Sequence, residues 1–104
     1  MTYRVILTTE AEEDLLRLFD FLLERELASG GNLDVAGRAL AAIKDAFTLL
    51  EQFPFTCRKV GPSTFLRELV IPFGETGYVA LFEILDRHTV AIAAVRHQRE
   101  DDYH

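Results

Sequence analysis

Two arginines stand inside or at the end of apolar runs in the second half of this 104-residue chain. Arg67 opens the run Arg-Glu-Leu-Val-Ile-Pro-Phe-Gly, and Arg96 closes the run Val-Ala-Ile-Ala-Ala-Val-Arg. Burying even a neutral polar group without a partner costs about 1–3 kcal/mol, so each guanidinium must find one. Because its fork matches two oxygens at once, an arginine here indicates either an anion-binding site or a structural contact.

His97 follows Arg96 directly and titrates near neutral pH, so it could move a proton beside a cation. A strand-end histidine bonded to backbone explains it equally well. Further potential metal ligands occupy the C-terminal segment: Glu100, Asp101, Asp102 and His104. Their spacing matches no metal motif with a mechanism, so we expect a solvated acidic tail, no metal and no cofactor.

Cys57 is the only cysteine, which excludes an internal disulfide and a thiolate metal cluster. A spectator thiol in a loop is the simpler interpretation, although the next two residues are basic and could activate a nucleophile.

The formal net charge is −6, which argues against a general nucleic-acid binder. The charge is uneven, because residues 1–52 carry 5 basic and 10 acidic side chains whereas residues 58–99 carry 6 and 4. That imbalance permits a local anion-facing surface in the second half. No apolar run approaches the ~20 residues that span a bilayer, and no signal peptide is apparent, so we expect a cytoplasmic protein without membrane contact.

Apolar residues recurring every three or four positions predict two helices. The run Thr9-Glu-Ala-Glu12 offers a capping box for the first, which we expect to end near Ala28. Asn32 or Asp34 can cap the second, and Pro54 stops it. The short glycine-containing break between them predicts an antiparallel helical hairpin.

Alternating β-branched and aromatic residues predict strands, and residues 55–64 read as a loop. The four expected strands are Tyr3–Leu7, Phe65–Ile71, Tyr78–Leu85 and Thr89–Arg96. The last three are joined by connections so short that they must be antiparallel. The sequence therefore predicts one α+β domain over residues 1–104. It is a two-layer βααβββ arrangement with an N-terminal helical hairpin on a mainly antiparallel four-stranded sheet. The sheet order is not readable from the pattern.

The order and the sequences of these segments resemble those of a toxin of the RelE/ParE superfamily, in the plasmid stabilisation branch of bacterial type II toxin–antitoxin systems. The resemblance covers essentially the whole chain and rests on these segments: Tyr3–Leu15, Phe53-Pro54, Arg67–Gly74, Gly77–Ile84 and Arg96–His104. It implies the βααβββ order and a cognate antitoxin that binds in an apolar groove to form a hetero-oligomer.

The resemblance leaves two functions open. A ParE-like toxin would poison a bacterial target, DNA gyrase, by protein binding, with Arg67, Arg96, His97, Arg99 and Tyr103 as target-binding residues. A RelE-like toxin would instead cut mRNA on the ribosome, with Arg67 and Arg96 holding the phosphate and His97 or Tyr103 moving protons, without a metal. RelE-type enzymes are lysine-rich before the first strand arginine. This chain has only two lysines in all, which favours the first function.

Three apolar residues of the first predicted helix fall off its main stripe, namely Leu16, Phe21 and Leu27. Exposed apolar residues that gather in this way often mark a partner surface. We therefore expect them to contact the antitoxin, although a wider contact with the core would explain them equally well.

Overall fold

The computed structural model describes residues 2–32, 34–74 and 76–98. Helix α1 (Thr9–Ser29) begins at Thr8, whose hydroxyl oxygen accepts a hydrogen bond from the Ala11 amide at 3.1 Å. The capping box predicted at Thr9 is thus wrong by one residue. The cap falls earlier because the Thr8 amide also donates to the carbonyl of Ile92 in the sheet, which ties this residue outside the helix. Gly30 ends α1 in the left-handed conformation that glycine adopts readily.

Helix α2 (Asp34–Leu49) follows after a short break. Just before it, the side-chain oxygen of Asn32 accepts from the amide of Asp34 at 2.8 Å, and Asp34 is the first residue of the helix. A short 3-10 helix, η1 (Pro54–Thr56), comes next and begins one residue before the predicted loop. The expected helical hairpin is therefore present, and neither helix of the described residues has the length and apolarity needed to cross a bilayer.

The sheet has five strands, one more than predicted. Its strands are β1 (Arg4–Leu7), β2 (Arg58–Lys59), β3 (Leu66–Phe73), β4 (Thr76–Ile84) and β5 (Thr89–His97). The additional strand, β2, is too short to show a period and lies inside the predicted loop. The three predicted antiparallel strands form hairpins as expected, and β1 lies parallel to β5, giving the order β1-β5-β4-β3-β2.

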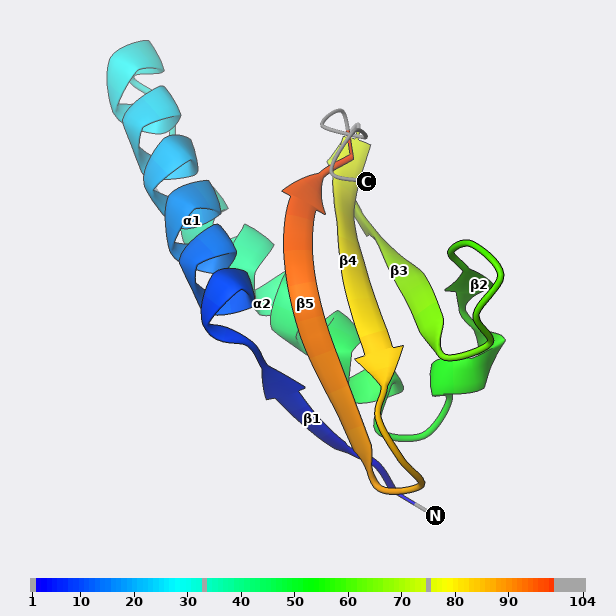
Figure 1. Ribbon diagram of the computed structural model, residues 1–104. Coiled ribbons are helices and arrows are strands. Elements are labelled where there is room, and N and C mark those ends of the chain that lie inside the picture. Colours follow the sequence, from blue (N-terminus) through cyan, green and yellow to red (C-terminus); the bar gives the residue numbers. More distant parts are fainter. Residues whose placement is uncertain (1, 33, 75, 99–104) are drawn as a thin grey trace.

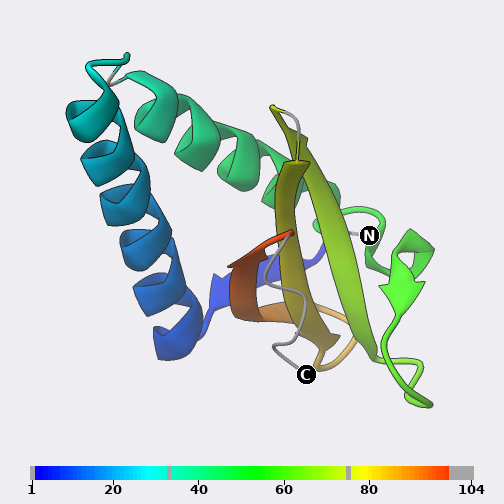
Figure 2. The ribbon, with the colours of Figure 1, turned by 90° about the horizontal axis from the view of Figure 1, so that it is seen from above.

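Both helices cover the same face of this sheet, as Figures 1 and 2 show from two directions. Alternate residues of each strand point into the space between the layers. The core consists of Ala11, Leu18, Ala39, Ile43, Phe47 and Leu50 on the helical side, and of Leu69, Ile71, Tyr78, Ala80, Phe82, Ile84, Val90, Ile92 and Val95 on the sheet. The register of β4 and β5 shifts between Leu81 and Phe82, and beyond this shift Val95 of β5 still belongs to the core. The predicted two-layer α+β fold is confirmed.

The backbone conformation at position 77 in β4 requires a glycine. Its φ is +150°, and a Cβ atom built there would lie 2.2 Å from the carbonyl oxygen of Ile71 on the neighbouring strand. No side chain fits at that distance, so this glycine lets β3 and β4 approach closely at their turn.

Candidate functional site

Arg67 binds the segment between η1 and β3. Its Nε donates to the carbonyl of Thr64 at 2.8 Å, and one terminal nitrogen donates to the carbonyls of Phe55 and Cys57 at 2.9 and 2.6 Å. The guanidinium carbon also lies 5.3 Å from the centre of the Phe55 ring. Charged donors to three backbone carbonyls hold this loop against the sheet, so most of the hydrogen-bonding capacity of Arg67 is used within the chain.

Arg67 therefore has the partners that its sequence context required, and they are backbone carbonyls. It shares the helix-covered face with Leu69 and Ile71 but lies beyond the end of α2, where the loop replaces the helix. Sequence could not reveal this, because the partners are backbone carbonyls and carry no residue signature.

Arg96 has a different partner, the carboxylate of Asp14 in α1. The Asp14 side chain is 7% exposed. One of its oxygens binds the Arg96 guanidinium and also accepts from the Val95 amide at 2.9 Å. The other binds Arg17 at 3.0 Å. Because β1 pairs with β5 only as far as Ile92, the Asp14 carboxylate takes over as acceptor at the β5 edge beyond it.

Asp14 is not among the residues that the sequence predicted for this site; it acts here as the buried partner of Arg96. A usable signal was present, because Asp14 lies three residues after Ala11 and four before Leu18, on the buried stripe. A carboxylate at such a position must be paired, since an uncompensated buried charge is strongly destabilising.

The two arginines lie on opposite faces of the sheet. Arg67 stands opposite Phe82, a core residue, whereas Arg96 stands opposite Val79 and follows Val95, whose side chain is fully buried on the helical side. From strand spacing and rise, their Cα atoms lie roughly 14 Å apart. The structure therefore does not bring Arg67 and Arg96 together around one phosphate.

His97 ends β5 beside Tyr78, and the two rings meet edge to face with centres 5.6 Å apart. Tyr78 is buried, and burial raises the pKa of its hydroxyl, which keeps it neutral. The other two predicted target-binding residues, Arg99 and Tyr103, lie outside the described residues.

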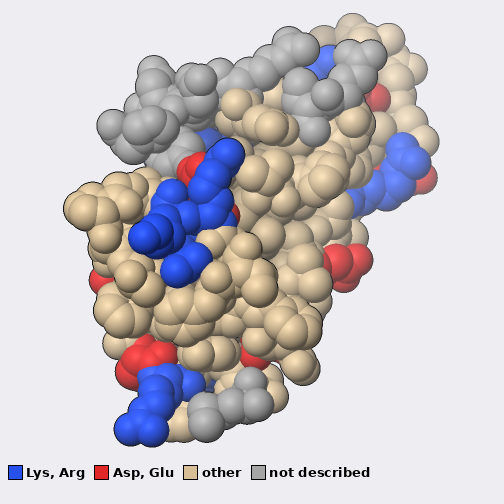
Figure 3. Space-filling view, turned by 90° about the vertical axis from the view of Figure 1, so that its right-hand side faces the viewer, with Lys and Arg blue, Asp and Glu red and all other residues tan. Residues whose placement is uncertain are grey.

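A small basic group lies over β2 and β3. Figure 3 shows Lys and Arg side chains gathered there beside a wide uncharged surface. The exposed members are Arg58, which binds Glu68 at 2.5 Å, and Lys59, which stands opposite Arg67 in the register.

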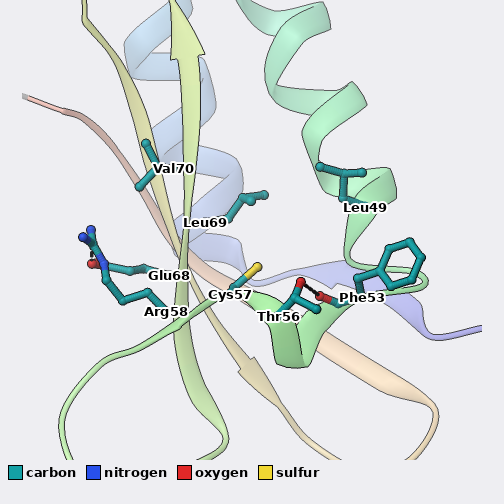
Figure 4. A pocket seen from close by; sticks show the side chains of 8 residues that line it. All are labelled: Leu49, Phe53, Thr56, Cys57, Arg58, Glu68, Leu69 and Val70. Carbon is teal, nitrogen blue, oxygen red and sulfur yellow. Dashed lines mark hydrogen bonds and ion pairs between the residues drawn. The ribbon is translucent and has the colours of Figure 1, made fainter.

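A groove of about 390 Å³ runs next to this group, between the end of α2 and β3. Figure 4 shows the eight residues that line it: Leu49, Phe53, Thr56, Cys57, Arg58, Glu68, Leu69 and Val70. Leu49, Phe53 and Val70 are exposed there although they are apolar. Burial raises the pKa of the Cys57 thiol against the opposing effect of Arg67, so a nucleophilic thiolate is disfavoured.

The predicted antitoxin-binding residues are all exposed, with Leu16, Phe21 and Leu27 at 65%, 57% and 67%. They do not form one stripe. Leu16 and Leu27 are roughly three turns apart and so share a side of α1, whereas Phe21 is rotated from Leu16 by about 140°. Leu16 and Phe21 instead flank a shallow depression that also includes Glu13, Asp20 and Glu24. The predicted wider contact with the core is thus wrong, and the antitoxin contact stays a prediction.

Within the described ranges, no three histidine, cysteine, aspartate or glutamate side chains are arranged to hold a metal ion. The potential ligands named from sequence lie, apart from His97, outside those ranges.

Comparison with known proteins gives consistent matches. Residues 5–102 match the family model described as ParE toxin of type II toxin-antitoxin system, parDE. The chain is 36% identical over 85 residues to Toxin RelE1 from Caulobacter vibrioides, covering 82% of this chain and 83% of that protein.

Two solved structures share the fold. The toxin–antitoxin complex RelBE2 from Mycobacterium tuberculosis matches with 28% identity and a TM-score of 0.62, over 93% of this chain and 99% of that chain. The chromosomal ParDE system from P. aeruginosa matches with 15% identity and a TM-score of 0.72, over 92% and 96%.

Proposed function

This chain belongs to the ParE toxin family of type II toxin–antitoxin systems, and we propose that it poisons a bacterial target by binding it rather than by chemistry of its own. DNA gyrase is the target that the resemblance to the ParE branch implies. A cognate antitoxin would neutralise the toxin by binding its surface. The protein would then act in the cytoplasm, where that target lies.

The observation that carries this proposal is the arrangement of Arg67 and Arg96. Cleavage of RNA by its own 2′-hydroxyl needs cations placed together on the phosphate, with a base and a proton donor in reach. Here the guanidinium groups lie on opposite faces of the sheet, and each is bound inside the chain, Arg67 to carbonyls and Arg96 to Asp14. Both therefore support the fold that presents a binding surface.

The basic group at β2 supports the same conclusion. An enzyme that enters a ribosomal RNA cleft benefits from a large positive surface. In this chain the two exposed cations of β2 are accompanied by Glu68, and the whole protein carries a charge of −6. Local contacts with a protein partner do not require a large positive surface.

Induction of the chain in cells without its antitoxin tests the proposal. We expect DNA supercoiling and chromosome integrity to fail before translation, measured by plasmid topoisomer gels and by pulse labelling of new protein. Ribosome-bound mRNA cut in codon register before any change in supercoiling would instead establish the alternative, a ribosome-dependent mRNA endonuclease.

A further inference from the structure

A second hollow opens at the end of the core, beside the turn between β4 and β5. Its volume is about 320 Å³, and the buried side chain of Ile84 is part of its lining. Figure 1 shows this turn at the opposite end of the molecule from the connection between α1 and α2. We call the hollow the aromatic cleft, because Tyr3, Phe55 and Phe65 line it together with Leu85.

The aromatic cleft exposes large apolar side chains that the fold leaves uncovered. Phe55, Phe65 and Leu85 are exposed by 44%, 51% and 51%. Removal of apolar surface from water is favourable, so these side chains favour a partner that covers them. Exposed apolar side chains that gather at one hollow are typical of a binding surface.

Arg67 fixes the backbone that carries both phenylalanines of the cleft. Its guanidinium donates to the carbonyl of Phe55 at 2.9 Å and to that of Thr64, the residue before Phe65, at 2.8 Å. The guanidinium carbon also lies 5.3 Å from the centre of the Phe55 ring. The two phenylalanine rings meet edge to face, with centres 6.3 Å apart and planes at 72°. One side chain therefore joins η1 to the start of β3 and sets this pair.

Neighbouring backbone contacts hold the Phe65 side of the cleft as well. The Phe65 carbonyl accepts from the Ile84 amide at 2.8 Å, and the Phe65 amide donates to the Ser63 hydroxyl oxygen at 3.1 Å. A surface held in this way loses little conformational entropy when a partner binds, which strengthens binding. Rigid aromatic side chains around a hollow are frequent anchors of protein interfaces.

The rim of the cleft offers a partner one cation. Asp86 and Arg87, in the turn between β4 and β5, both line the cleft and are exposed. The Asp86 carboxylate serves the turn, because it accepts from the His88 amide at 2.7 Å, and this hydrogen bond is the main cause of its lowered pKa. Arg87 forms no ion pair with any residue that the structure describes. Its guanidinium is therefore available to a partner, and a carboxylate complements it.

A second copy of this chain does not fit the hollow. Dimers of identical chains are most often two-fold symmetric, so each copy presents the same surface to the other. Two facing hollows bring no side chain into either of them. A protruding side chain of a different protein fits the cleft, and the proposed function supplies such a partner in the poisoned target.

We propose that the aromatic cleft binds the protein target, by taking in an exposed apolar or aromatic side chain that has an acidic residue beside it to meet Arg87. Arg67 is a positioning residue, which does not touch the target but sets Phe55 and Phe65 for it. The assignment rests on the proposed function and deepens it, because it names the surface that meets the target. Of the target-binding residues expected from sequence, Arg67 acquires an indirect role.

Footprinting of the unaltered chain tests the place of the contact. The toxin is mixed with purified DNA gyrase and exposed to hydroxyl radicals, and the oxidation of each side chain is measured by mass spectrometry. Oxidation of Phe65 and Leu85 should fall about threefold or more in the complex, because the partner excludes water from the cleft. Phe53, which is exposed by 57% outside the cleft, should be oxidised as before.

Matched variants test the apolar lining. Leu85→Ser is paired with Leu49→Ser, and Phe65→Ser with Phe53→Ser. The paired residues are similarly exposed, 51% against 54% and 51% against 57%, but only the first of each pair lines the cleft. We expect the first to weaken gyrase binding about tenfold to a hundredfold and the second by less than about twofold.

Charge reversal tests the rim. Arg87→Glu should weaken gyrase binding about tenfold at low salt and by less at high salt, because salt screens the repulsion from an acidic partner. Arg38→Glu, at an exposed residue of α2, is the control and should change the affinity by less than about twofold. Equal effects of the two reversals would contradict the role of Arg87.

The positioning role of Arg67 has a readout that a loss of stability alone would not change. In Arg67→Lys, the nuclear Overhauser effect between the Phe55 and Phe65 rings should disappear, and gyrase binding should weaken about tenfold at a temperature at which the variant is folded. Ile43→Val, a destabilising change in the core of α2, should keep both the ring contact and the affinity. Full affinity of Arg67→Lys would refute the positioning role.

Unchanged oxidation of Phe65 in a gyrase complex that forms, with equal binding by Phe65→Ser and Phe53→Ser, would overturn this inference and leave the proposed function intact. Loss of antitoxin binding instead of gyrase binding in Phe65→Ser and Leu85→Ser would overturn it too. Failure of the unaltered chain to bind DNA gyrase would overturn the proposed function and, with it, the cleft as its site. Because the footprint uses the unaltered chain, it decides the matter even if a variant does not fold.

Discussion

The carboxylate of Asp14, near the start of α1, and the guanidinium of Arg96, near the end of β5, form an ion pair that also includes the Val95 amide and Arg17. This pair connects the first helix to the last strand at the point where β1 no longer covers the edge of β5. It holds in place the end of the strand from which the C-terminal segment continues.

Replacement of Asp14 tests that connection. Asp14→Ala should lower the free energy of unfolding by about 2–4 kcal/mol, because it removes the acceptor of Val95 and leaves Arg96 without its partner. Asp14→Asn should cost less, since an amide oxygen still accepts from Val95. Urea unfolding measures both, with Asp20→Ala on the exposed side of α1 as the control. Equal stability of Asp14→Ala and the unaltered chain would contradict the assignment.

Arg67 should act through stability rather than through a bound phosphate. Arg67→Lys and Arg67→Met should each lower the free energy of unfolding by about 1–3 kcal/mol, because a lysine ammonium does not reproduce the fork that reaches three carbonyls. Arg87→Lys, in the turn between β4 and β5, is the matched control. Full stability of Arg67→Lys together with total loss of toxicity would point instead to a direct role at the target.

Purified protein should leave free RNA intact, with or without a chelator. The net charge of −6 repels a polyanion, and the described residues hold no group of metal ligands. Incubation with a labelled transcript, followed by gel electrophoresis, provides the measurement. RNA cleavage that a chelator abolishes would refute both functions considered for this chain.

The thiol of Cys57 should react slowly with alkylating reagents. Burial raises its pKa, so at a pH of about 8.5, where half of free cysteine is ionised, less than half of Cys57 is thiolate. The same shift means that its contribution to stability is complete below that pH and is lost as the pH rises through the raised value. Iodoacetamide labelling of the native and the urea-unfolded chain gives the two rates, and faster labelling of the native chain would contradict the shift.

The exposed side chains of Leu16 and Leu27 on α1 provide a test of antitoxin binding. Leu16→Ser and Leu27→Ser should weaken the complex together, because the two residues lie on one side of the helix. Neither should lower the melting temperature of the free chain by more than a few degrees, since both side chains already face solvent. Titration calorimetry with the antitoxin measures the effect. Unchanged affinity in both variants would show that Leu16 and Leu27 lie outside the interface.

Periodicity predicted the helices, the three antiparallel strands and the two-layer arrangement, because each depends on local spacing of apolar residues. It could not predict β2, whose two residues show no period, or the parallel place of β1, which depends on contact with a strand far along the chain.

The candidate site was predicted less well, because its contacts join segments that lie far apart in the sequence. Arg67 and Arg96 were identified correctly as residues that must have partners. Their partners, three carbonyls and Asp14, come from segments that only the folded chain brings near. Nothing in the spacing of the two arginines indicated that they face opposite sides of the sheet.

The place of β5 between β1 and β4 has a consequence for the order of events during synthesis. The first strand leaves the ribosome early, yet its neighbour in the sheet is the last strand to be made. Pairing of β1 with β5 must await synthesis of β5, and such distant contacts form slowly. A nascent or truncated chain that stops before Thr89 therefore cannot complete the sheet. The sheet that presents the surface of this toxin is therefore complete only once β5 has left the ribosome.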